Sequence, residues 1–131
     1  PIHYSFRLVL KKISKVLSEK RIHRYLLTEP GQIQKYDLII HATPMGMAGH
    51  KAANDLPLLK EFLFPGQLLF DIVYNPASTP LVKLAKVKKL EIIPGYKMLL
   101  YQGILQFNIF TGLEAPRIVM EKELRKALQI R

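Results

Sequence analysis

The chain has 131 residues, of which 49% are hydrophobic and 23% are charged, values that fit about one globular domain. It contains no cysteine, which excludes a disulfide framework and a thiolate metal site and fits a reducing compartment. The longest charge-free run, residues 98–113, is interrupted by polar residues and falls short of the roughly 20 apolar residues of a membrane-spanning helix. We therefore expect a soluble, cytoplasmic protein, and the four histidines show no metal-ligand spacing.

The formal net charge of +10 is unevenly distributed. The first 35 residues hold only two acidic side chains, Glu19 and Glu29, against a basic set that comprises Arg7, Lys11, Lys12, Lys15, Lys20, Arg21, Arg24 and Lys35. This excess indicates either an anionic partner, such as a nucleic acid or a nucleotide phosphate, or a solvated lysine-rich surface. No nucleic-acid-binding module is recognisable, so we do not expect a nucleic-acid partner.

The first third of the chain predicts a strand over Tyr4–Leu10, a short helix over Ile13–Lys20 and a short strand over Ile22–Leu27. Lys11 and Lys12 form the turn between the first strand and the helix. Two ammonium groups beside a helix N-terminus suit a phosphate, although two exposed lysines are an equally good interpretation.

A second clear strand is predicted over Tyr36–Ala42. It ends in Thr43-Pro44-Met45-Gly46-Met47, a turn whose backbone groups we expect to be free to face a ligand. One or two helical turns are expected over Leu58–Phe64.

The stretch from Leu68 to Pro80 predicts a strand, a turn and a helix start. Leu68–Val73 is a short apolar run typical of a buried strand, and Asn75-Pro76 favours a turn. Thr79 suits the N-cap, with Pro80 at the first position of a helix over Pro80–Lys88. Tyr74 stands where the strand ends, which is where open α/β sheets bind ligands.

Residues 90–130 predict a short strand over Leu90–Ile93, stopped by Pro94-Gly95, and two helices, Lys97–Phe110 and Glu114–Ile130. The first helix is apolar on most sides, which predicts burial against more than one partner. Gln102 is an uncharged hydrogen-bonding group in that helix, so it either meets a partner such as a polyol ligand or faces water.

Strands that alternate with helices predict an α/β fold with a parallel sheet. Loops after three of the predicted strands, Thr43–Met47, Tyr74–Thr79 and Pro94–Lys97, would then lie at one edge of that sheet. We expect a ligand site at this edge.

Three blocks of sequence, in order, resemble the shikimate dehydrogenase family. The first is His41-Ala42-Thr43-Pro44-Met45-Gly46-Met47, and the second is Asp71-Ile72-Val73-Tyr74-Asn75-Pro76 with Thr79-Pro80-Leu81. The third comprises Pro94-Gly95, Met98-Leu99, Tyr101-Gln102-Gly103, Gln106-Phe107, Thr111-Gly112 and Ala115-Pro116. Together the blocks cover residues 36–116.

The resemblance implies an NADP-dependent oxidoreductase that interconverts 3-dehydroshikimate and shikimate on the route to chorismate and the aromatic amino acids. It implies that Tyr74 and Gln102 bind shikimate and that NADP contacts Ile72, Gly95 and Met98 on its nicotinamide side. By the same resemblance, Thr43 flanks the adenosine side of the cofactor. Lys11 and Lys12 align with the segment that binds the 2′-phosphate.

The departures from the family predict an incomplete enzyme. The family's catalytic lysine and aspartate belong to a substrate domain that this chain does not contain, and no G-x-G-x-x-G phosphate loop occurs. His41 replaces the usual asparagine, and we interpret it as a satisfied or half-exposed histidine. Asp71 lies inside a strand, so no residue of this chain is placed to act as the general acid or base.

We therefore expect a partial Rossmann-like parallel sheet flanked by helices. Residues 1–113 would form an NADP-binding domain that lacks its first strand and glycine-rich loop, and residues 114–131 a C-terminal helix that packs on the absent substrate domain. The missing first strand would leave a sheet edge exposed, so we expect the chain alone to dimerise or aggregate. The alternative interpretation is a non-catalytic nucleotide- or anion-binding module derived from the same fold.

Overall fold

The computed structural model describes residues 36–130. Within this range a parallel three-stranded sheet has the order β1 (Leu38–His41), β2 (Leu68–Asp71) and β3 (Glu91–Pro94). In the sheet Leu69 of β2 is paired with Ile39 of β1 and with Ile92 of β3. The elements predicted before Tyr36, and with them Lys11 and Lys12, lie outside the described residues.

In residues 36–130, four helical elements accompany the strands: a 3-10 turn η2 (Lys60–Phe62), and the α-helices α2 (Pro80–Val87), α3 (Gly95–Thr111) and α4 (Arg117–Ala127). Each strand and helix that the sequence predicts after residue 35 is present, with ends shifted by at most three residues. The α/β class and the parallel sheet are confirmed. No helix in this part of the chain is both long and apolar enough to cross a membrane.

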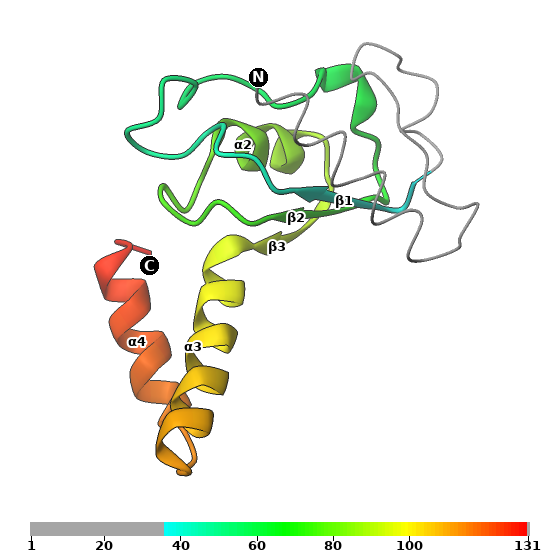
Figure 1. Cartoon of the computed structure of the whole chain (residues 1–131). Coiled ribbons are helices and arrows are strands. Elements are labelled where there is room, and N and C mark those ends of the chain that lie inside the picture. The colour runs from blue at the N-terminus through cyan, green and yellow to red at the C-terminus, as the bar shows by residue number, and fades with distance from the viewer. Residues whose placement is uncertain (1–35, 131) are drawn as a thin grey trace, which may run out of the picture.

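The hydrophobic core lies between α2 and one face of the sheet (Figure 1). It consists of Leu63, Leu69, Leu81, Ala85 and Leu90. Ile39 of β1 is packed against this core, and side chains alternate between the two faces of a strand, so the neighbours of Ile39 point to the other face. There Leu38 is 47% exposed and Ile40 is 57% exposed. Parallel sheets are ordinarily buried on both faces, and here one face of β1 is open.

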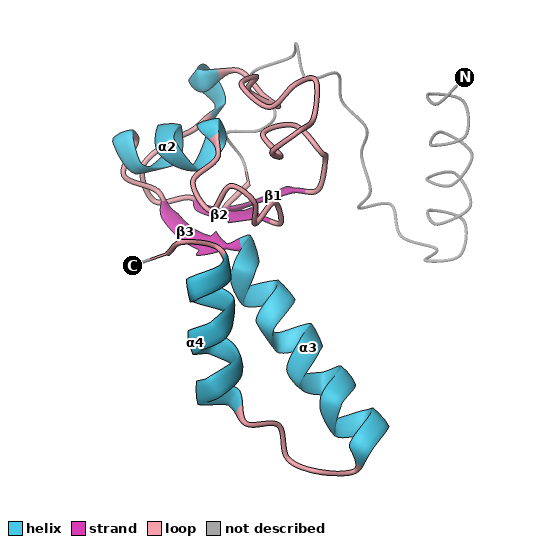
Figure 2. Ribbon diagram, turned by 90° about the vertical axis from the view of Figure 1, so that its left-hand side faces the viewer, coloured by secondary structure: helices cyan, strands magenta, loops and turns pink. Residues whose placement is uncertain are grey.

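Helices α3 and α4 form an antiparallel hairpin that extends away from the sheet, on the side opposite α2 (Figures 1 and 2). Gly103 of α3 lies close to Met120 of α4, and the side-chain oxygen of Asn108 accepts the Ala115 N–H at 2.8 Å. Gly112, with φ of 69°, ends α3 in the left-handed conformation that a glycine adopts at low cost.

Two predictions about this region are wrong. Pro94-Gly95 is not followed by a loop, because Pro94 is the last residue of β3 and Gly95 is the first residue of α3. Helix α3 is also not buried on several sides, since only Gly95, Tyr96 and Leu100 are buried in it. The helix leaves the sheet after its first turns, and beyond them α4 covers only one of its sides.

Candidate functional site

The loop after β1 is held in place by its own backbone and by the start of α2. The N–H groups of Gly46, Met47 and Ala48 donate to the carbonyls of Ala52, Pro44 and Asn75 respectively. These N–H groups are therefore not free to face a ligand, contrary to the prediction. Gly46 has a φ of +80°, and a Cβ there would lie 3.2 Å from the Cβ of Thr79, so this position requires glycine.

The loop after β2 turns back at a cis peptide bond between Asn75 and Pro76. It then enters α2 through Thr79, whose Oγ1 accepts the N–H of Val82 at 3.1 Å, with Pro80 at the first helical position. This N-cap confirms the predicted helix start. The Ala48 N–H donates to the Asn75 carbonyl at 2.8 Å and joins the two loops. The sheet edge therefore carries two loops that form one unit.

The fully buried carboxyl group of Asp71, at the end of β2, anchors both loops. Its Oδ1 accepts the Val73 N–H at 3.1 Å and lies 2.8 Å from Nδ1 of His41, while its Oδ2 accepts the hydroxyl of Thr79 at 2.6 Å. The acid is thereby bonded to the end of β1, to the loop after β2 and to the N-cap of α2. Such pairing offsets the desolvation of a buried carboxylate.

His41 connects this buried acid to the surface. Its side chain is buried, and its Nε2 lies 2.6 Å from Oγ1 of the exposed Thr43. His41 is thus a satisfied histidine, as the sequence predicts.

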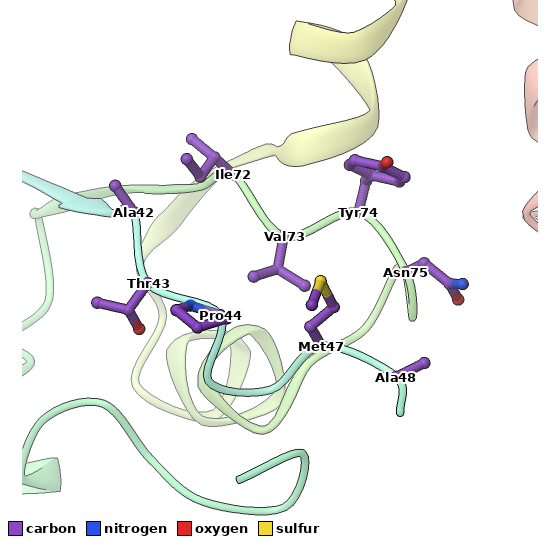
Figure 3. Close-up of a pocket in the computed structure, with 9 residues that line it drawn as sticks. All are labelled: Ala42, Thr43, Pro44, Met47, Ala48, Ile72, Val73, Tyr74 and Asn75. Atoms are coloured by element: carbon purple, nitrogen blue, oxygen red, sulfur yellow. The ribbon is translucent and has the colours of Figure 1, made fainter. Parts of the chain in front are cut away.

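A pocket of about 340 Å³ lies between the two loops (Figure 3). Its lining is mostly apolar and comprises Ala42, Thr43, Pro44, Met47, Ala48, Ile72, Val73, Tyr74 and Asn75. The volume is at the lower end of the range for ligand clefts, so the pocket can enclose part of a large ligand. The position, outside the carboxyl ends of parallel strands, is the usual one for a ligand in an open α/β sheet.

Comparison with known proteins relates this arrangement to one family. Residues 95–125 match the family described as Shikimate 5′-dehydrogenase C-terminal domain. The chain is 44% identical over 127 residues to the shikimate dehydrogenase (NADP(+)) of Leptospira interrogans, a match that covers 95% of this chain and 42% of the relative. The chain is a homologue of part of the shikimate dehydrogenases.

Solved structures agree with the sequence match. The fold superposes on a shikimate dehydrogenase in complex with NADP+ with a TM-score of 0.78 and 32% identity, covering 90% of this chain and 41% of that one. It superposes on the Thermus thermophilus shikimate 5-dehydrogenase, in complex with NADP(H) and shikimate, with a TM-score of 0.67 and 31% identity; 79% of this chain and 38% of that one are covered. The resemblance predicted from the three sequence blocks is confirmed. The chain spans about two fifths of the length of these relatives.

The structure brings together three of the site residues that the shikimate dehydrogenase resemblance predicts. Thr43, Ile72 and Tyr74 line the pocket. Gly95 is buried next to it, because a Cβ on Gly95 would lie 2.7 Å from backbone atoms of Asp71 and Ile72. The structure therefore supplies a packing reason for this glycine, separate from any contact with a cofactor.

The other two described candidates of the shikimate dehydrogenase motif lie on α3 and do not line the pocket. Met98 is half-buried and Gln102 is exposed. Their predicted roles in binding NADP and shikimate stay predictions. The prediction missed the connection of Asp71, His41, Thr43 and Thr79, although the position of Asp71 inside an apolar strand signals an acid that needs partners.

Proposed function

We propose that this chain forms the cofactor side of an NADP-dependent shikimate dehydrogenase, which reversibly reduces 3-dehydroshikimate to shikimate in the biosynthesis of chorismate and the aromatic amino acids. The observation that carries this proposal is the superposition of 90% of the chain on a shikimate dehydrogenase in complex with NADP+. The pocket at the carboxyl ends of β1 and β2 supports it. An enzyme of this pathway is expected in the cytoplasm.

The residues around the pocket fit one end of NADP. The apolar lining residues, among them Ile72, Val73 and Met47, suit a flat uncharged ring, and Thr43 and Tyr74 also line the pocket. The pocket is too small for a whole dinucleotide, and the sequence contains no G-x-G-x-x-G loop for the pyrophosphate. NADP, when bound, supplies the hydride chemistry, and the protein supplies binding and orientation.

The cofactor-binding roles follow from position and from the family resemblance. In this proposal Ile72 packs against the nicotinamide, while Gly95 and Met98 border it from the start of α3. Thr43 contacts the cofactor from the loop after β1. Lys11 and Lys12 provide point charges for the 2′-phosphate.

The substrate-binding roles belong to Tyr74 and Gln102, whose side chains would hydrogen-bond shikimate. Tyr74 is 39% exposed at the rim of the pocket, and Gln102 is exposed on α3. In this proposal a substrate domain elsewhere in the protein supplies the proton-transfer pair. That domain covers the exposed side of the α3–α4 hairpin.

Turnover by the native protein tests the proposal. We expect NADP+ reduction with shikimate, and we expect Tyr74→Phe and Gln102→Ala each to lower kcat/KM by about tenfold, because each change removes a hydrogen bond to the substrate. Tyr36→Phe is the matched control, since Tyr36 is an exposed tyrosine outside the pocket, and should leave the rate unchanged.

The intact mass of the native protein should accompany the assay. A mass well above the 15.1 kDa of this chain would agree with a further domain. NADP+ binding without turnover at 15.1 kDa would favour the non-catalytic nucleotide-binding module instead. A protein that binds no NADP+ would contradict the dehydrogenase proposal.

A further inference from the structure

The first turn of α3 is in close contact with the start of the loop after β2. A Cβ on Gly95 would lie 2.7 Å from the backbone carbonyl oxygens of Asp71 and Ile72. Ile72 lines the pocket, and Figure 3 shows the beginning of α3, in yellow, next to this segment. A shift of the first turn of α3 therefore changes the position of the pocket lining, because no space separates the two backbones.

Tyr96, the second residue of this turn, is held by a side chain from α4. Tyr96 is 8% exposed, and its hydroxyl accepts an N–H of the Arg125 guanidinium at 3.2 Å. The guanidinium carbon also lies 5.9 Å from the centre of the tyrosine ring, within the range of a cation–π contact. Arg125 is half-buried in the last turn of α4, so the pair joins that turn to the first turn of α3.

A second pair with the same chemistry lies farther along the hairpin. Arg117 donates to the hydroxyl of Tyr101 at 3.0 Å and lies 5.2 Å from its ring centre. Both of these side chains are exposed, whereas Tyr96 is buried and follows Gly95 directly. The Arg117–Tyr101 pair is therefore a matched comparison for the Arg125–Tyr96 pair.

We propose that Arg125 is a positioning residue for the pocket, because by holding Tyr96 it fixes the first turn of α3 against Ile72. Met98 and Gln102 lie on the same helix, two and six residues after Tyr96, and move with that turn. The consequence for NADP and shikimate rests on the proposed function, since the binding roles of Met98 and Gln102 belong to it.

The chemistry of the pair explains why its loss moves the turn. A buried tyrosine hydroxyl needs a hydrogen-bond partner, and without Arg125 the hydroxyl of Tyr96 gains one by moving toward water. A guanidinium both donates to the hydroxyl and stacks on the ring, so it restrains the position and the tilt of Tyr96 together. Small displacements matter, because a misplacement of about 1 Å can lower a rate by roughly 100-fold.

The first experiment measures the position of the turn without any ligand. Methyl NMR of the native protein reports the Ile72 δ1 and Met98 ε methyl groups. We expect Arg125→Met, which keeps an unbranched side chain but removes the charge and the donors, to shift both resonances. Arg117→Met removes the exposed pair and should leave both in place. Unchanged Ile72 and Met98 resonances in Arg125→Met would overturn the proposal.

The second experiment is a double-mutant cycle on turnover of NADP+ and shikimate by the native protein. We expect Arg125→Met to lower kcat/KM by about tenfold. Tyr96→Phe keeps the ring and loses only the hydroxyl, so it should lower kcat/KM by about threefold. In the Tyr96→Phe background, Arg125→Met should cause a further loss of no more than about threefold. An equal effect in both backgrounds would contradict action through Tyr96.

Two controls and thermal unfolding separate positioning from stability. Lys126→Met removes the same charge at an exposed residue beside Arg125. This variant and Arg117→Met should both stay within about twofold of the wild-type kcat/KM. If Arg125→Met lowers the unfolding temperature but leaves kcat/KM of the folded protein unchanged, the pair only stabilises the hairpin and the proposal is wrong.

Failure of the proposed function gives a different result. A native protein that neither binds NADP+ nor oxidises shikimate would contradict the dehydrogenase assignment. The methyl resonances of Ile72 and Met98 would still be measurable in that case, and they would decide the positioning role of Arg125 by themselves.

Discussion

Asp71 is the residue on which the loops of the site depend most. Three donors, from His41, Val73 and Thr79, converge on its buried carboxylate, and they come from three separate segments of the chain. A single side chain therefore holds the end of β1, the loop after β2 and the first turn of α2 together.

We expect Asp71→Ala to destabilise the protein by about 3–5 kcal/mol, because it leaves buried donors without an acceptor. That is a large share of the roughly 5–15 kcal/mol typical of a domain. Denaturant unfolding followed by circular dichroism measures the loss. Asp55→Ala, at an exposed aspartate, is the control and should stay within about 0.5 kcal/mol of the wild type. Equal midpoints for Asp71→Ala and wild type would contradict the anchoring role.

At the level of elements, the junction between β3 and α3 packs against the start of the loop that forms one wall of the pocket. The helix begins immediately after the strand, and Gly95 allows its first turn to lie against the backbone of Asp71 and Ile72. The missing side chain of Gly95 thus lets the backbone of α3 lie close to the backbone at the end of β2. It places the start of α3 beside the loop that carries Ile72 and Tyr74.

Two glycines of α3 provide a matched test of this packing. We expect Gly95→Ala to destabilise the protein by about 1–3 kcal/mol or more, because its Cβ would lie 2.7 Å from backbone atoms that cannot rotate away. Gly103→Ala meets only the end of the Met120 side chain at 3.5 Å, and should be neutral or stabilising by up to about 1 kcal/mol through helix propensity. Thermal unfolding measures both, and the opposite order of stabilities would contradict the packing argument.

At the scale of the whole molecule, the exposed apolar surface of the hairpin is the prominent feature. Tyr101, Leu105 and Ile109 follow one another at intervals of four residues on α3, and Leu105 and Ile109 are 60% and 68% exposed. Phe110 of α3 and Ile118 of α4 are also exposed, at 83% and 84%. Exposed apolar side chains gathered on one hairpin in this way indicate an interface.

We therefore expect the 131-residue chain by itself to self-associate at concentrations of tens of micromolar. Sedimentation velocity measures the association, and Leu105→Lys combined with Ile109→Lys should shift the chain toward the monomer. Val87→Lys places the same charge on an exposed apolar residue of α2, away from the hairpin, and should have little effect. A monodisperse wild-type monomer would contradict this expectation.

The amino-acid sequence alone was enough to predict the elements after residue 35 and the family resemblance. Apolar runs of strand length, Thr79-Pro80 and helical spacing are local features, and local backbone preference with side-chain burial is enough to produce the elements they predict. The three motif blocks carried the family resemblance, because each combines turn residues with polar groups in an order that composition alone does not produce. Parallel topology then placed Thr43 and Tyr74 at one edge of the sheet.

Which groups meet at that edge depends on long-range packing that the sequence pattern does not reveal. Asp71 and His41 are 30 residues apart, and their bond depends on the register of β1 against β2, which no local pattern specifies. The direct entry from β3 into α3 and the exposure of Gln102 likewise depend on how the hairpin leaves the sheet. Contacts between distant segments follow from packing, so the hydrogen bonds that link Asp71, His41 and Thr43 form only when the strands lie side by side.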